Sequence, residues 1–154
     1  MSALRFEPGG LDRDDVLALL DEHLAEMRAT SPAESVHALP VDGLRADGVM
    51  FWSARAGDVL VGCGALKDLG GGHAEIKSMR TAASARGRGV GHRLLRHLLD
   101  EARRHGCTRV SLETGTQDHF LPARRLYERH GFVSVGPFGD YTLDPSSTFY
   151  SRGL

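Results

Sequence analysis

The stretch ARGRGVGHRLLRHLL, residues 85–99, constrains the fold of this chain more than any other segment. Glycines stand at every second position, Gly87, Gly89 and Gly91, and leucines then recur at helical spacing. The glycines predict a turn whose backbone N–H groups are open to a ligand, because no Cβ atom covers them. The leucines predict an amphipathic helix that packs one face on a sheet. A glycine-rich turn at a helix N-terminus is an anion site, since the first N–H groups lack internal partners and the helix dipole is positive there.

Length and composition limit the class of protein. The 154 residues predict one domain over 1–154, long enough to bury a core without disulfides or a metal. Cys63 and Cys107 form no ligand spacing, so we expect neither a metal nor a disulfide. No segment has the apolar run of a membrane span or signal peptide, so we expect a cytoplasmic protein with no membrane partner.

Charge is unevenly distributed along the chain. The net charge of −1 attracts no nucleic acid, and we expect no such partner. Residues 1–50 hold ten Asp and Glu against four Arg, whereas residues 80–109 hold eight Arg against two acidic residues. The middle of the chain therefore favours an anionic ligand, with a more acidic flank beside it.

Hydrophobic spacing and turn residues predict the element order β-αα-βββ-α-β-α-ββ. The predicted strands are 4–6, 49–54, 59–67, 71–81, 108–114, 132–138 and 147–153, and the predicted helices are 11–29, 41–45, 90–105 and 122–131. The fold class is therefore α/β: a mixed, mostly antiparallel sheet of about seven strands flanked by about four helices.

The glycine spacing excludes two familiar phosphate motifs. A dinucleotide fingerprint requires a third glycine where His92 or Leu94 stands, and a Walker loop requires a lysine after its last glycine. The spacing that fits is R-G-x-G-x-G.

The segments IKSMRTAASARGRGVGHRLLRHLLDEARRHGCTRVSLETG and PARRLYERHGF resemble the GNAT superfamily of acetyl-CoA-dependent N-acetyltransferases. The segments EHLAEMRATSPAESVHAL, FWSA, GCGALK and EIKSMRT are similar to its YsnE-like subgroup. The resemblance covers the strand order of almost the whole chain and the motif residues over about 75–135. It implies the GNAT fold, acetyl-CoA as co-substrate, a small-molecule amine as acceptor and, by analogy, a homodimer.

The resemblance also implies the cofactor site. The strand before the loop splays from its neighbour, and the backbone of Met79 and Thr81 binds the pantetheine arm. The pyrophosphate lies on the N–H groups of the loop. The implied cofactor residues are Met79, Arg80, Thr81, Arg86, Gly87, Arg88, Gly89, Val90, Gly91 and His92.

Catalysis requires a neutral amine, and a carboxylate whose pKa is raised by burial is a suitable base. Glu75 is the first candidate, because histone-acetylating members of the superfamily carry their general-base glutamate at this place. Glu113 is the alternative base, and His37 and His73 are candidate proton relays. Tyr127 occupies the superfamily's tyrosine position for the acid that protonates the leaving thiolate.

One position departs from the superfamily pattern. Phe120 stands where many members have an asparagine that contacts the cofactor arm. That contact is either lost or made by Gln117 or His119.

Substrate recognition in this superfamily falls on the first two helices and their connection. The residues implied here are His23, Met27, Ser31, His37 and, on the facing hairpin, Trp52. Arg28 or Arg80 is a candidate partner for an acceptor carboxylate.

Three functions remain open from the sequence. The first is acetyl transfer to a small amine or amino acid. The second is a non-catalytic acyl-CoA-binding or sensing module. The third is acetylation of a protein lysine or N-terminus.

Overall fold

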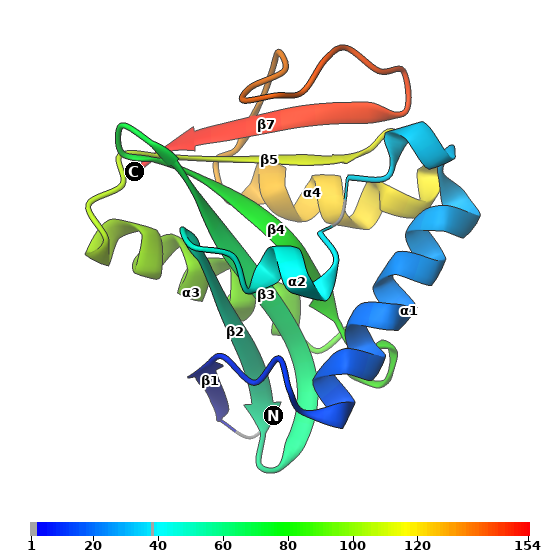
Figure 1. Cartoon of the computed structure of the whole chain (residues 1–154), viewed down its shortest axis with the longest axis vertical. Coiled ribbons are helices and arrows are strands. Elements are labelled where there is room, and N and C mark those ends of the chain that lie inside the picture. Colours follow the sequence, from blue (N-terminus) through cyan, green and yellow to red (C-terminus); the bar gives the residue numbers. More distant parts are fainter. Residues whose placement is uncertain (1–2, 38) are drawn as a thin grey trace.

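The protein folds as one twisted sheet with helices on both faces (Figure 1). The structure is a computed structural model that describes residues 3–37 and 39–154. The strands are β1 (Leu4–Pro8), β2 (Val49–Ala56), β3 (Val59–Gly70), β4 (His73–Thr81), β5 (Arg109–Gly115), β6 (Val133–Val135) and β7 (Ser147–Gly153). The α-helices are α1 (Asp14–Thr30), α2 (Val41–Leu44), α3 (Val90–Arg104) and α4 (Leu121–Arg129), and the short 3-10 helices are Ala33–Ser35, Ala83–Ala85 and Asp118–Phe120.

The sheet has seven strands in the order β1-β2-β3-β4-β5-β7-β6. Every pair is antiparallel except β4 with β5, which is parallel and joined by the α3 crossover. The predicted element order and the mixed, mostly antiparallel sheet are confirmed.

The ends of β3 and β6 differ from the predicted strand ends. β3 continues three residues further, to Gly70, because Asp68 and Gly70 still pair with Ala74 and His73 of β4. β6 covers only Val133–Val135, since it is an exposed edge strand that Gly136 and Pro137 end. Its pairing with β7 is correspondingly short.

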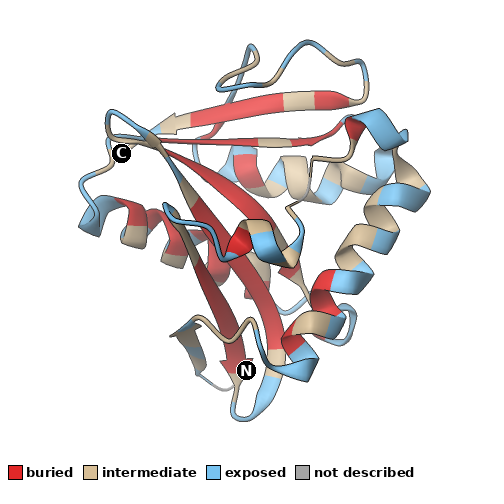
Figure 2. Ribbon diagram, viewed as in Figure 1, coloured by how far each residue is buried: buried red, intermediate tan, exposed pale blue. Residues whose placement is uncertain are grey.

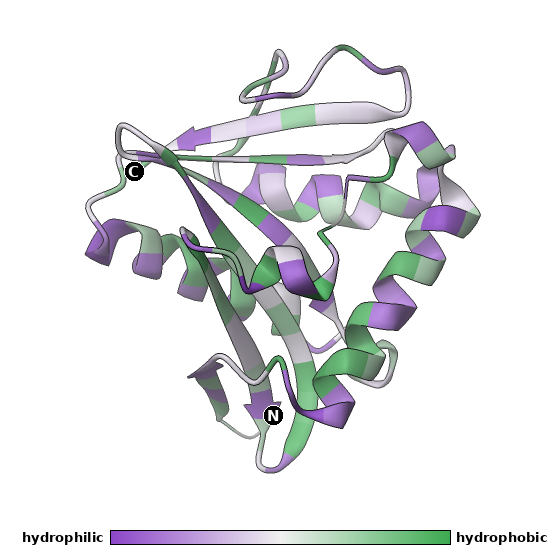
Figure 3. Ribbon diagram, in the orientation of Figure 1, coloured by the Kyte–Doolittle hydropathy of each residue, from purple (hydrophilic) through white to green (hydrophobic). Residues whose placement is uncertain are grey.

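The two faces of the sheet bury separate apolar clusters. On one face, leucines of α3 and residues of α4 pack on β2–β5 around Leu95, Leu98 and Tyr127. On the other face, Val16, Leu19 and Leu20 of α1 and Leu44 of α2 pack on β2 and β3. Burial is concentrated in the strands and in the helix faces turned to them (Figure 2). Figure 3 shows the matching alternation of hydrophobic and hydrophilic residues along α1 and α3.

Candidate active site

The parallel strands β4 and β5 separate soon after they pair. Their register joins His73, Ala74 and Glu75 to Arg109, Val110 and Ser111, and no further. β4 runs on to Thr81 and β5 to Gly115, so the two strands diverge beyond these pairs (Figure 1). A cavity of about 110 Å³ lies at this divergence. The splay implied by the resemblance is therefore present.

The cavity receives side chains from both faces of the sheet. The predicted site residues that line it are His23, Met27, His37, Glu75, Met79, Glu113 and Tyr127. Lys77, Ser78, Phe120 and Tyr141 line it as well. Residues from α1 thus meet residues from α4, although the sheet lies between these helices elsewhere.

Glu75 lies in a buried hydrogen-bonded cluster. Its side chain is 4% exposed, and its Oε2 accepts a hydrogen bond of 2.5 Å from the Tyr141 hydroxyl. Lys77 Nζ lies 3.5 Å from the same Oε2 and donates to Tyr141 Oη at 2.9 Å. Lys77 also donates to the His37 carbonyl at 2.9 Å. Glu75 is therefore the counter-ion of Lys77.

Glu113 has different surroundings. Ser111, two residues before Glu113 on β5, pairs with Glu75 of β4. Because side chains two residues apart on a strand point to the same face, Glu113 lies on the same face of the sheet as Glu75. Burial raises the pKa of Glu113 to about 7. A carboxyl with this pKa is partly ionised at neutral pH and can accept a proton there.

Tyr127 enters the cavity from α4. It is 7% exposed and packs against Phe132 and Tyr150. Burial, with the nearby charge of Glu113, raises the pKa of Tyr127 to about 12. The phenol therefore keeps its proton at neutral pH and can donate it.

The glycine-rich loop forms the N-terminus of α3, as predicted. Gly87 and Gly89 have φ of 78° and 77°, a left-handed conformation that favours glycine, and Gly89 is the N-cap residue of α3. No atom lies within 4 Å of where a Cβ would stand on either residue. These two glycines leave the loop surface open.

Gly91 has a packing role in addition to its predicted place in the anion-binding loop. It is helical, and an added Cβ would lie 3.3 Å from Leu126 Cδ2 and 3.6 Å from Thr81 Oγ1. Gly91 therefore lets α3 pack closely against α4 and β4.

Two arginines near the loop, Arg80 and Arg86, pair with Glu26 of α1. Arg80 donates to both carboxylate oxygens of Glu26, at 2.8 and 3.0 Å. Arg86 Nη2 lies 3.5 Å from Glu26 Oε1. The hydrogen bond from Arg80 lowers the pKa of Glu26 to about 2, so the carboxylate stays charged. Glu26 thus orients Arg80 and Arg86 beside the loop.

Three predicted residues lie elsewhere. Trp52 is 5% exposed and packs edge-on against His97 of α3, so its assignment to the acceptor site is wrong. It faces the α3 side because its neighbour Phe51 fills the α1 side. Ser31 caps the C-terminus of α1 and does not line the cavity. His73 bonds Ser111 Oγ at 2.6 Å and is also outside the lining.

Phe120 occupies the position of the expected asparagine and lines the cavity. Its ring lies against Gly115, where an added Cβ would be 2.2 Å from Phe120 Cδ2. His119 Nε2 lies 3.7 Å from Glu26 Oε2. Neither His119 nor Gln117 lines the cavity. Phe120 therefore gives the cavity an apolar wall.

Lys77 and Tyr141 were missed by the sequence analysis. Lys77 follows Glu75 by two residues, and this period-two spacing is the signal that places both on one face of a strand. Tyr141 lies in the loop between β6 and β7, where no periodicity identifies it.

The described residues also bear on other types of functional site. A second cavity of about 420 Å³ lies near the β3–β4 turn and the end of α3, away from Glu113 and Tyr127. In residues 3–37 and 39–154, no group of three or more His, Cys, Asp or Glu side chains could hold a metal ion. No helix within the described part of the chain is long and apolar enough to span a bilayer.

Comparisons with known proteins identify the family. The model of the acetyltransferase (GNAT) family matches residues 16–132, most of the chain, and the protein belongs to this family. It is an acyltransferase of the acetyl-CoA-dependent class.

Individual relatives are similar over nearly their whole length. The uncharacterized N-acetyltransferase YsnE of Bacillus subtilis is 50% identical over 139 residues, which cover 90% of this chain and 92% of YsnE. A protein of Azospirillum brasilense named IAA acetyltransferase is 39% identical, and the match covers 92% of each chain. A solved structure from Klebsiella pneumoniae, described as a candidate acyl-CoA N-acyltransferase, superimposes with a TM-score of 0.80 at 27% identity and covers 98% of this chain and 97% of its own.

Proposed function

We propose that the protein transfers the acetyl group of acetyl-CoA directly to a primary amine of a small molecule, with both substrates bound together. One observation carries this proposal: the cavity between the splayed strands is lined by Glu113, a carboxyl with a pKa of about 7, and by the protonated phenol of Tyr127. A base and an acid on opposite sides of one cavity are the two groups that aminolysis of a thioester requires.

The residues before and at the start of α3 fit the co-substrate. The backbone of Met79 and Thr81 is the proposed contact for the pantetheine arm, since the splay leaves this edge of β4 without a neighbouring strand. The N–H groups from Arg86 to His92 are the proposed site for the pyrophosphate. Gly87 and Gly89 fit this role, because no atom stands over them. Arg86 and Arg88 are exposed and add cationic donors.

Each proposed catalytic residue moves one proton. Acetyl-CoA supplies an acyl group activated as a thioester. Glu113 accepts a proton from the amine, whose nitrogen forms the new bond to the carbonyl carbon. Tyr127 donates a proton to the sulfur as the carbon–sulfur bond breaks. The products are an amide and a thiol, and the proton on Glu113 is returned to Tyr127 through solvent.

The two alternatives make different demands on the site. A sensing module would need neither Glu113 nor Tyr127 at the cavity. A protein acetyltransferase would need, besides the cavity, a surface groove that holds a polypeptide.

The test combines binding and turnover. Millimolar CoA should raise the melting temperature, because a ligand that binds only the folded state stabilises it. Thiol release from acetyl-CoA should then depend on an added amine in a panel that also contains IAA, the compound named for the A. brasilense relative. Stabilisation by CoA without turnover on any amine would favour the sensing module, and turnover on IAA alone would contradict an amine acceptor.

Tyr127→Phe separates the acid from the binding site. The variant should lose turnover by roughly 10²–10⁴-fold, the usual contribution of a positioned acid. Its affinity for CoA should stay unchanged, because Phe retains the packing against Phe132 and Tyr150. Unchanged turnover would exclude Tyr127 as the acid.

A further inference from the structure

The charges around the acceptor half of the cavity restrict which amines can bind there. From their arrangement, we propose that the acceptor is a small amine that carries no carboxylate, so that free α-amino acids are poor substrates. This inference rests on the proposed function and narrows its substrate class.

Two carboxylates face the cavity from adjacent strands. Glu75 of β4 and Glu113 of β5 both line it, and the β4–β5 register places them on one face of the sheet. Like charges close together at a partly buried site repel strongly, because little water screens them. A substrate carboxylate would be a third acidic group in a space that has one lysine, Lys77, whereas a substrate ammonium would be attracted to the glutamates.

Lys77 is the one Lys or Arg among the described residues that line the cavity, and it is already engaged. Its ammonium has three N–H donors. Two donate to the His37 carbonyl and to Tyr141 Oη, each at 2.9 Å, and the Glu75 carboxylate lies 3.5 Å from Nζ. The side chain is only 9% exposed. A substrate carboxylate would have to displace one of these partners.

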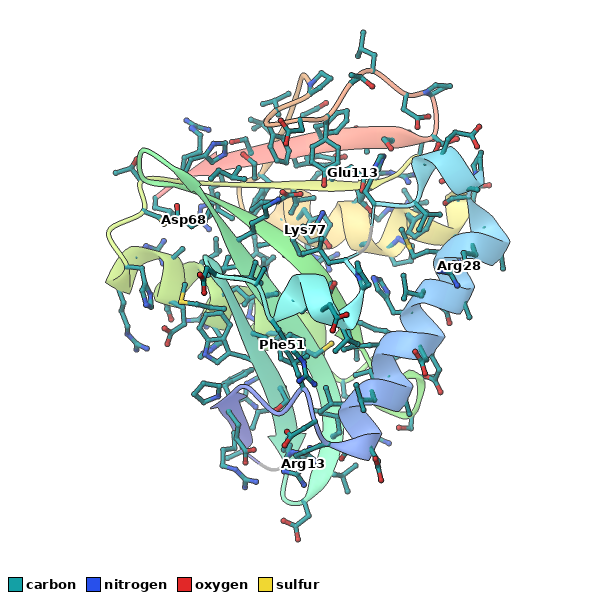
Figure 4. The ribbon with its side chains drawn as sticks, in the orientation of Figure 1. Arg13, Arg28, Phe51, Asp68, Lys77 and Glu113 are labelled. Atoms are coloured by element: carbon teal, nitrogen blue, oxygen red, sulfur yellow. The ribbon has the colours of Figure 1, made fainter. Side chains whose placement is uncertain are left out.

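The arginines suggested by the sequence are not available either. Arg80 forms a two-point pair with Glu26, at 2.8 and 3.0 Å, and does not line the cavity. Arg28 is exposed on α1. Figure 4 shows it away from Lys77 and Glu113, which lie near each other. These positions correct the expectation that Arg80 or Arg28 binds an acceptor carboxylate.

The histidines of the cavity do not replace an arginine. Burial and the nearby Arg80 lower the pKa of His23 to about 4, so this ring is neutral at physiological pH. The ring of His37 packs edge-on against Tyr141, with 5.0 Å between the ring centres. Among the described residues that line the cavity, the glutamates can accept hydrogen bonds from an ammonium, and no Lys or Arg side chain is left to pair with a carboxylate.

Matched acceptors test the inference. Alanine, alaninamide and ethylamine share an amine, but only alanine has a carboxylate. Alaninamide has nearly the size of alanine and so controls for bulk. We expect kcat/KM, calculated on the concentration of the neutral amine, to be about tenfold or more higher for alaninamide and ethylamine than for alanine, because like charges in contact repel each other. A value for alanine equal to or above that for alaninamide overturns the inference.

Two variants should shift this preference in opposite directions. Glu75→Gln removes one negative charge, so the alaninamide-to-alanine ratio of kcat/KM should fall severalfold. Lys77→Met removes the positive charge, so the ratio should rise. Glu34→Gln, on an exposed residue outside the cavity, should leave the ratio unchanged. Melting temperatures verify that each variant is folded, and a ratio that is the same in both cavity variants contradicts the inference.

The outcomes separate this inference from the proposed function. No acetyl transfer to any of the three acceptors or to the wider amine panel, with CoA still stabilising the protein, refutes the proposed function and this inference together. Transfer to alanine as efficient as transfer to alaninamide refutes the inference alone.

Discussion

At the scale of single residues, Glu75 and Glu113 differ in what surrounds their carboxylates. Glu75 accepts a hydrogen bond from Tyr141 and pairs with Lys77, so its negative charge is compensated. Burial instead raises the pKa of Glu113 to about 7. A base is most effective when its pKa is near the working pH. Glu113 is therefore the better candidate for the proposed base, and Glu75 is the counter-ion of Lys77.

This difference predicts distinct pH profiles. In the wild type, kcat/KM should rise with pH and level off above about 7, because Glu113 must lose its proton before it can accept another. Glu113→Gln should lower kcat/KM at pH 8 by roughly 10²–10⁴-fold and abolish that rise. The profiles should be measured with two amines of different pKa, so that titration of the substrate is recognised.

Glu75→Gln is the matched control for this assignment. It should retain the pH-dependent rise and most of the activity towards ethylamine. Loss of activity at every pH in Glu75→Gln, with Glu113→Gln active, would identify Glu75 as the base instead.

The sequence could predict only part of this residue-level picture. Glu75, Glu113 and Tyr127 could be proposed because the segments around them resemble the GNAT superfamily. The contact between Glu75 and Tyr141 joins residues 66 positions apart and depends on how the β6–β7 loop folds back. No local pattern encodes such a contact. Trp52 shows the same limit, since alternation along a strand does not say which face meets the substrate.

At the scale of elements, the start of α3 combines two uses of glycine. Gly87 and Gly89 provide left-handed backbone at an open loop, whereas Gly91 allows close helix packing. Apolar periodicity and the glycine turn were sufficient to predict α3 and its N-terminus. The division of labour among the glycines was not predictable, because it depends on Leu126 of α4.

Gly89→Ala tests the loop against a matched control. Gly57 has φ of 62° in the β2–β3 turn and, like Gly89, no atom within 4 Å of an added Cβ. Both alanine variants should lose roughly 1–2 kcal/mol of stability from left-handed strain. Only Gly89→Ala should weaken CoA binding, by roughly tenfold or about 1.4 kcal/mol, because its methyl group enters the proposed phosphate space. Isothermal titration with CoA measures this, and equal CoA affinities of the two variants would exclude the loop as the phosphate site.

At the scale of the whole molecule, the buried carboxyl of Glu113 lowers the stability of the fold at neutral and higher pH. The folded-state pKa of Glu113, about 7, lies above its ordinary value of 4.5 because the carboxyl is buried. Ionising a group whose pKa is raised by folding disfavours the folded state. Glu113 therefore does not lower the free energy of unfolding below pH 4.5, and it lowers this free energy increasingly as the pH rises towards 7.

Glu113→Gln should consequently be more stable than the wild type at pH 8, by about 1–3 kcal/mol. The difference should vanish at pH 4, where Glu113 is protonated in both the folded and the unfolded chain. Chemical denaturation at the two pH values measures it. Equal stabilities at pH 8 would show that Glu113 is not a desolvated carboxyl.

In the proposed reaction, acetyl passes directly from acetyl-CoA to a small amine inside this cavity. Initial rates of acetylated ethylamine formation, with both substrates varied, test it most directly. A complex that contains both substrates predicts intersecting double-reciprocal lines and one thiol released per amide formed. Parallel lines with an acetylated protein intermediate, or thiol release that does not depend on the amine, would contradict the account.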